Sequence, residues 1–177
     1  MQIRILKVET GESVNAAIER GWGRALPSLH DEGWKFNFHT LSRRLPNAST
    51  YVLVTEETPH IIEGCMIFQL LDEEMPYGAY LEVAPHNKGS EKKHDHVAGC
   101  LIAYAIQLSL DKGVGPYNGQ LYFDVSEENN DDEIKVRENY INRYGAEEVD
   151  GTTMRIADKN GQALIAKYLG GEQESAD

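Results

Sequence analysis

The sequence has 177 residues, 41% hydrophobic and 26% charged, which predicts one soluble globular domain over residues 1–177. Its 17 basic and 29 acidic residues give a formal net charge of −12, so we expect repulsion of phosphate groups, no nucleic-acid partner and no membrane partner. No apolar run approaches the roughly 20 residues of a membrane span, and no signal peptide is evident. Cys65 and Cys100 lack CxxC spacing. We therefore expect a cytoplasmic protein with buried thiols.

The first half of the sequence predicts mainly strands. Residues 3–8 form a short alternating run, and Ser13 is a candidate N-cap for a weakly amphipathic helix over residues 13–24. Residues 27–49 have no clear pattern. Strands separated by short polar turns are then predicted at residues 51–54, 61–71 and 80–83. This spacing is typical of an antiparallel meander.

The second half alternates helices with strands. Apolar residues recur at three- and four-residue steps from Val97 to Leu108, which predicts an amphipathic helix ending at Gly113. The remaining predicted elements are a strand at 121–125, a helix at 131–144, a strand at 152–156, a helix at 162–169 and a frayed tail at 170–177. The fold class is therefore mixed α/β (α+β). The strand at 79–84, the long helix and the strand at 120–125 predict a right-handed parallel crossover with a ligand crevice where the strands separate.

The segment from residue 81 to residue 102 carries the strongest functional signal. A strand and a basic loop lead into a helix whose first turn contains the small residues Ala98 and Gly99. The lysines of this loop are Lys88, Lys92 and Lys93. Free amides and the helix dipole at such an N-terminus favour a bound phosphate. The alternative is a solvated loop before a helix packed tightly through its small residues.

Three motifs in this part of the chain belong together. They are Leu81-Glu82-Val83-Ala84-Pro85 at a strand end, the turn Lys93-His94-Asp95-His96-Val97-Ala98, and Glu138-Asn139-Tyr140 leading into Arg143-Tyr144-Gly145-Ala146. This combination resembles the GNAT superfamily of acetyl-coenzyme A (acetyl-CoA)-dependent N-acetyltransferases, over roughly residues 50–169. Two positions depart from the family pattern: Lys93 replaces Gln or Arg, and His96 replaces the first glycine of the turn. A histidine could keep ordinary helical geometry there, and its side chain could crowd the pyrophosphate or donate a hydrogen bond to it. The tyrosine also lies five residues before Gly145, where four is commoner.

The resemblance implies a mostly antiparallel central sheet with splayed central strands, flanked by helices. It implies acetyl transfer from acetyl-CoA to a primary amine by direct attack in a ternary complex, with a small-molecule or peptide amine as acceptor. The cofactor-binding residues that it implies are Leu81 and Val83 for the pantetheine arm, and Lys93, His94, Asp95, His96, Val97, Ala98 and Gly99 for the pyrophosphate. A bulge near Val83 and Ala84 would separate the strands. The sequence leaves open whether the chain forms a homodimer.

Two residues are candidates for catalysis. Tyr140 could supply a proton to the departing thiolate, because a phenol keeps its proton at neutral pH; the alternative is a core-facing aromatic residue. Glu82 could act as a general base from the strand that lines the slot, or could simply face solvent. The rival hypothesis is a non-catalytic binding module of the same fold with a degenerate acyl-CoA slot, which His96 and the shifted tyrosine favour.

The histidines of the basic loop raise the question of a metal site. His94 and His96 flank Asp95, and His86 lies nearby, but the segment lacks a third well-spaced ligand. We therefore expect no bound metal. Cys100 lies one turn inside an apolar helix, so a packed thiol is favoured over an acyl-carrying nucleophile.

Overall fold

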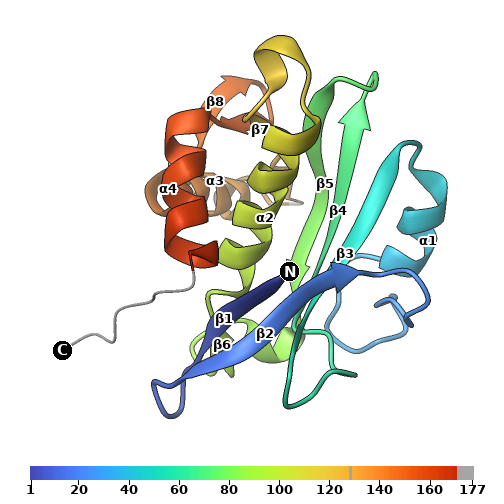
Figure 1. The fold of residues 1–177 in the computed structure, drawn as a ribbon, viewed down its shortest axis with the longest axis vertical. Coiled ribbons are helices and arrows are strands. Elements are labelled where there is room, and N and C mark those ends of the chain that lie inside the picture. The colour runs from blue at the N-terminus through green and yellow to red at the C-terminus, as the bar shows by residue number, and fades with distance from the viewer. Residues whose placement is uncertain (128, 171–177) are drawn as a thin grey trace.

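The computed structural model describes residues 1–127 and 129–170, which form a nine-stranded sheet flanked by four helices (Figure 1). The strands are β1 (Gln2–Lys7), β2 (Ser13–Arg20), β3 (Ala48–Thr55), β4 (Gly64–Leu71), β5 (Met75–Val83), β6 (His94–Asp95), β7 (Leu121–Asp124), β8 (Glu147–Asp150) and β9 (Thr153–Ile156). The helices are α1 (Phe38–Arg44), α2 (Val97–Lys112), α3 (Asn130–Tyr144) and α4 (Asp158–Leu169), with short 3-10 turns η1 (Pro85–Asn87) and η2 (Gly115–Tyr117). Beyond residue 170, the predicted frayed tail lies outside the described residues.

The sheet is mostly antiparallel, as predicted, with strand order β6-β1-β2-β3-β4-β5-β7-β9-β8. The parallel pair is β5 with β7, and α2 connects these two strands, which confirms the predicted crossover. In the described part of the chain their register consists of one pair, Tyr77 with Tyr122, and the strands separate beyond it. The structure contains a β-bulge, but not at the predicted position. It falls in β5 opposite Ile67 and Phe68, with Ala79 as the extra residue, rather than near Val83 and Ala84.

Residues 13–20 form strand β2, so the predicted helix over residues 13–24 is wrong. Val14 and Ile18 fit a helical spacing, but together with Ala16 they also fit the two-residue period of a strand, and all three pack in the core. Strand β2 pairs with β1 on one side and β3 on the other. These two backbone ladders outweigh the weak amphipathicity of the segment.

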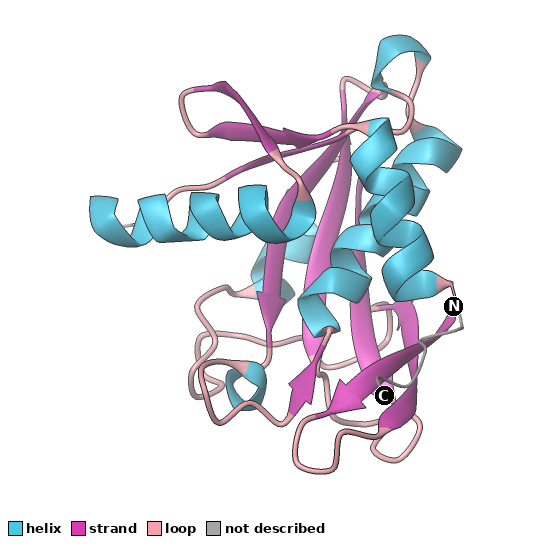
Figure 2. Ribbon diagram, turned by 90° about the vertical axis from the view of Figure 1, so that its left-hand side faces the viewer, coloured by secondary structure: helices cyan, strands magenta, loops and turns pink. Residues whose placement is uncertain are grey.

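Two hydrophobic clusters cover the two faces of the sheet. The larger one lies beneath α2 and α4, which pack side by side while α3 runs crosswise to them (Figure 2). The smaller one lies beneath α1, where Phe38 is fully buried against Val52 and Ile67. Gly99 permits the close approach of α2 and α4, since a Cβ atom there would lie 2.4 Å from the Tyr168 ring. No helix among the described residues is long and apolar enough to cross a lipid bilayer.

Candidate functional site

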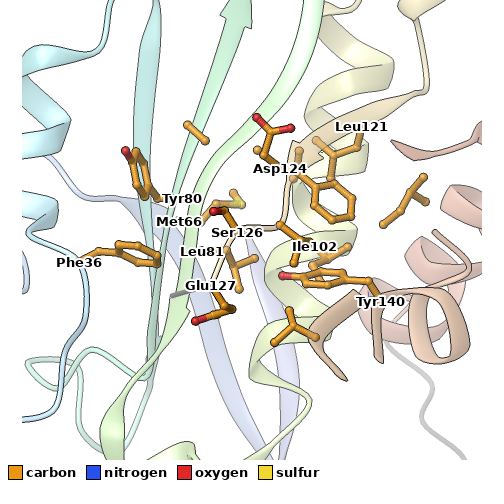
Figure 3. A pocket seen from close by; sticks show the side chains of 17 residues that line it. Phe36, Met66, Tyr80, Leu81, Ile102, Leu121, Asp124, Ser126, Glu127 and Tyr140 are labelled. Atoms are coloured by element: carbon orange, nitrogen blue, oxygen red, sulfur yellow. The ribbon is translucent and has the colours of Figure 1, made fainter. Parts of the chain in front are cut away.

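A pocket of about 140 Å³ lies where β5 and β7 separate (Figure 3). Most of its lining comes from the bulged part of β5, strand β7 with the loop after it, the middle of α2, and α3, and Phe36, Met66 and Ile156 complete it. The lining residues that matter for the chemistry are Phe36, Tyr80, Leu81, Asp124, Glu127 and Tyr140. The separated strands therefore leave a crevice at the position that the crossover predicts.

Tyr140 reaches this pocket from α3, and its hydroxyl points across the cavity toward the side formed by Leu81 and Glu127 (Figure 3). Its ring is held by Phe123, with ring centroids 4.7 Å apart, and by Tyr144 at 5.7 Å. Burial, followed by the negative charge of Glu127, raises the pKa of Tyr140 to about 12. The hydroxyl therefore keeps its proton at neutral pH and remains a hydrogen-bond donor.

Glu82 lies outside the pocket, although the sequence analysis expected it to face the slot. Its side chain is buried, and its carboxylate accepts hydrogen bonds from the backbone N–H groups of Lys35 (2.8 Å) and Phe36 (3.1 Å). Lys88 Nζ lies 2.6 Å from the same carboxylate. Glu82 thus anchors residues 33–36 to the sheet, and its oxygens are already occupied.

The carboxylates that do line the pocket are Asp124 and Glu127, and the sequence analysis missed both of them as site residues. Asp124 accepts hydrogen bonds from the hydroxyls of Tyr77 (2.8 Å) and Thr153 (2.7 Å). Glu127 forms an ion pair with Lys35 at 3.2 Å. One signal could have found them: Asp124 is the last residue of β7 and Glu127 lies three residues further on, at the carboxyl end that borders the predicted crevice.

The turn before α2 adopts the backbone geometry that favours glycine. His96 has a φ of 72°, so the suggestion of ordinary helical geometry at this position is wrong. Its backbone N–H donates to Asp95 Oδ1 at 2.7 Å. The first hydrogen bond of the helix runs from Cys100 N to His96 O (2.8 Å), so within the described part of the chain the N–H groups of Val97, Ala98 and Gly99 are the free donors of the first turn.

The carboxylate of Asp95 lies beside these donors. Lys92 contacts it at 2.7 Å and Arg143 of α3 at 3.1 Å. Burial acts to raise its pKa, but the hydrogen bonds from Lys92 and the backbone of His96 prevail and lower it to about 2. Asp95 is therefore ionised at neutral pH, and this corner of the molecule already contains one anion with its counterions.

The other predicted cofactor-binding residues fall into different environments. Leu81 lines the pocket, Val83 packs against the larger cluster, and the Lys93 side chain is exposed. His94 is buried and bonded to Glu63 at 2.9 Å, so its side chain is not available to a ligand at the turn. Gly99 packs against Tyr168, which agrees with the alternative interpretation of a helix packed tightly through its small residues.

Comparison with solved structures identifies the fold. No protein-family model and no curated protein matches the sequence. Among solved structures, a GNAT family acetyltransferase from Elizabethkingia anophelis with acetyl-CoA bound is 14% identical over 80% of this chain and 97% of its own, with a TM-score of 0.50. The chain has the GNAT fold. A chain of the KacTA–DNA complex is 14% identical over 85% of this chain and 98% of its own, with a TM-score of 0.56.

Similar structures of the GNAT fold also correct one expectation. The AtaT–AtaR complex bound to DNA contains a chain 15% identical to this one, over 84% of this chain and 99% of its own, with a TM-score of 0.54. Together with the KacTA–DNA complex, it contradicts the exclusion of a nucleic-acid partner. The exclusion rested on the net charge of one chain, whereas these structures are assemblies that include DNA. Net charge alone therefore gives no ground for that exclusion.

Proposed function

We propose that this chain is an acyltransferase that moves the acetyl group of acetyl-CoA to an amine by direct attack in a ternary complex. The observation that carries the proposal is the pocket between β5 and β7 with the Tyr140 hydroxyl directed into it. The acetyl-CoA bound to the similar structure from Elizabethkingia anophelis supports this choice of donor. Acetyl-CoA would supply the thioester carbonyl that the amine attacks.

The residues around the pocket fit such a donor in two respects. Among the residues that the structure describes, the edge of β5 beyond Tyr77 has no strand partner on the β7 side, so the backbone at Leu81 and Val83 is available to pair with an extended amide-containing arm. The free N–H groups of the first turn of α2 would receive the pyrophosphate. The exposed side chain of Lys93 adds positive charge at the same corner.

The chemistry needs a proton donor and a proton acceptor. Tyr140 is assigned the donor role toward the departing thiolate, because its hydroxyl lies in the pocket and stays protonated. Glu127 replaces Glu82 in the role of acceptor for the amine proton, directly or through water. Glu127 lines the pocket, whereas the carboxylate of Glu82 is committed to Lys88 and to two backbone amides.

A matched pair of variants tests the proposal. Tyr140→Phe removes the hydroxyl that lies in the pocket, and Tyr144→Phe removes one from the next turn of α3, outside the pocket. Coenzyme A release is followed with a thiol reagent, using a polyamine, an aminoglycoside and a lysine-containing peptide as acceptors. We expect Tyr140→Phe to lower kcat about 100-fold or more without changing the affinity for acetyl-CoA, and Tyr144→Phe to retain activity.

Two outcomes would contradict this proposal. One is the absence of coenzyme A release with every acceptor, combined with no change in thermal stability at millimolar acetyl-CoA. A ligand at a hundred times its dissociation constant should stabilise the fold by about 2.7 kcal/mol, which thermal unfolding detects readily. The other is full activity in Tyr140→Phe.

A second candidate function is a binding module of the same fold that no longer holds acetyl-CoA. The ionised carboxylate of Asp95 favours it, because that charge lies beside the amides that would receive the pyrophosphate. Thermal unfolding with and without acetyl-CoA separates the two candidates, since only the acyltransferase requires stabilisation by this ligand.

A further inference from the structure

Three side chains that are distant in sequence meet beside the loop that precedes α2. Glu63 immediately precedes β4, His86 lies in η1, and His94 begins the edge strand β6, which pairs with β1 (Figure 1). Both His86 Nε2 (2.7 Å) and His94 Nδ1 (2.9 Å) contact Glu63 Oε2. One potential ligand atom from each residue lies within 4.8 Å of the other two.

The carboxylate of Glu63 is unusual because it is fully buried and one of its two oxygens accepts no hydrogen bond from the described residues. The residue is 0% exposed, and its Oε1 atom has no hydrogen-bond partner among the described residues. Its other oxygen, Oε2, is contacted by His86 Nε2, His94 Nδ1 and Asn87 Nδ2. An ionised carboxylate in such a place is costly unless a cation accompanies it.

We propose that Glu63, His86 and His94 form a binding site for a divalent transition-metal ion of the zinc type. Two imidazoles and one carboxylate are a donor set that Zn²⁺ accepts, with a fourth position left for water. The unused Oε1 of Glu63 is available as a carboxylate ligand, while His86 Nε2 and His94 Nδ1 would exchange their contacts with Oε2 for bonds to the ion. Each imidazole would bind through the nitrogen that now faces Glu63 and carry its proton on the other ring nitrogen.

The surroundings of the three residues support this role. Asn87 Nδ2 donates to Glu63 Oε2 at 2.7 Å, and Asn87 Oδ1 accepts from the backbone N–H of His94 at 2.9 Å. These bonds hold two of the ligands in place, as outer-shell partners do in metal sites. The His86 side chain is 39% exposed, which gives an ion a path to the otherwise buried site.

A bound ion would also stiffen the turn before α2. His94 directly precedes Asp95 and His96, so fixing its ring fixes the start of the helix that carries the free amides. The proposal does not depend on acetyl transfer, because neither its ligands nor its test involves acetyl-CoA.

The test uses the full-length chain after treatment with a chelator. Zinc chloride is titrated into the wild-type protein and into His86→Ala, with His60→Ala as the matched control because His60 is exposed and outside the cluster. We expect one ion per wild-type chain, a loss of affinity of at least about tenfold in His86→Ala, and wild-type binding in His60→Ala. The thermal midpoint should rise with zinc in the wild type and His60→Ala but not in His86→Ala.

The variant Glu63→Gln gives a second measurement, since it keeps the side-chain shape and removes the charge. It should also lose zinc binding, and circular dichroism reports whether it is folded. Affinity in the wild type should fall with acid, because protons compete for imidazole nitrogens. The proposal is overturned if the wild type binds no stoichiometric zinc, or if His86→Ala binds it as tightly as the wild type does.

Discussion

At the scale of single residues, the charge of Asp95 decides how well the α2 N-terminus can receive an anion. Its carboxylate offsets part of the charge of Lys92 and Arg143, so the corner is less positive than its cations alone would make it. The lysine-rich loop therefore contributes less free positive charge than its sequence indicates. Lys88 is likewise paired, with Glu82.

Replacement of this carboxylate has two measurable effects. In Asp95→Asn, acetyl-CoA should bind about tenfold more tightly, because one negative charge near the pyrophosphate is removed. Calorimetric titration measures this effect, with Glu57→Gln as an exposed control. A decrease in affinity would contradict the assigned position of the pyrophosphate.

The same substitution predicts a pH dependence of stability. The pKa of Asp95 in the fold, about 2, lies below the ordinary value of 3.8, so its ionised form stabilises the native state. This contribution, about 1 kcal/mol after allowance for solvent screening, is complete above about pH 4 and is lost as the pH falls toward 2. Urea unfolding of wild type and Asp95→Asn should therefore show a difference at pH 7 that shrinks between pH 4 and pH 2.

Individual residues also show which parts of the site the sequence could predict. The Tyr140 motif pointed to a residue that does line the pocket, because a local pattern fixes its place on α3. Glu63 carried no such signal, since it lies 23 residues from His86 and 31 from His94 and only the tertiary fold brings them together. The left-handed backbone of His96 did have a signal, because His96 occupies a glycine position of the turn and histidine adopts this geometry more often than most non-glycine residues do.

At the scale of elements, the packing of α2 on α4 depends on the absence of a side chain at Gly99. Gly99→Ala would place a Cβ atom 2.4 Å from the ring of Tyr168, so the two helices must separate. We expect a loss of about 2 kcal/mol in the free energy of unfolding. Denaturant unfolding measures it, with Ala98→Ser as a half-buried control in the same turn.

A double variant isolates the cause of that loss. If the clash with Tyr168 is responsible, Gly99→Ala should cost less when it is combined with Tyr168→Ala than when it is made alone. Equal costs in the two backgrounds would contradict the contact as the explanation.

Elements whose apolar residues recur with one clear period were predicted correctly, whereas β8 and β2, which lack such a pattern, were not. Helix α2 and the meander β3–β4–β5 have clear apolar patterns, and both form close to their predicted positions. Strand β8 has four exposed residues, so no apolar face marked it in the sequence. Strand β2 was assigned to a helix because its apolar residues satisfy both periods, and only its two neighbours in the sheet resolve the choice.

At the scale of the whole molecule, the two cysteines lie in different cores and report on global unfolding. Cys65 belongs to the cluster beneath α1 and Cys100 to the one beneath α2 and α4, and both are 0% exposed. Burial raises the pKa of Cys100 to about 12, and it raises that of Cys65 as well. Neither thiolate is therefore available in the native state.

Thiol labelling of the native protein should thus be slow. We expect an aromatic disulfide reagent to modify neither thiol at pH 8 on the time scale of minutes, and both thiols in concentrated urea. The two thiols should become reactive together if the sheet unfolds cooperatively. Fast labelling of one thiol under native conditions would reveal local opening of its cluster. Slow labelling also means that coenzyme A release is measured without interference from the protein.

The single backbone pair between Tyr77 and Tyr122 has a mechanical consequence. Within the described residues, the ladder is continuous from β6 to β5 and again from β7 to β8, and between these two parts it is reduced to one rung. The part built from β7, β9 and β8 is therefore attached to β5 through one backbone pair and through side-chain contacts such as the hydrogen bond from Tyr77 to Asp124. A rotation that widens the gap would break this one backbone pair and the hydrogen bond from Tyr77 to Asp124, so the seam has few hydrogen bonds to oppose such a motion.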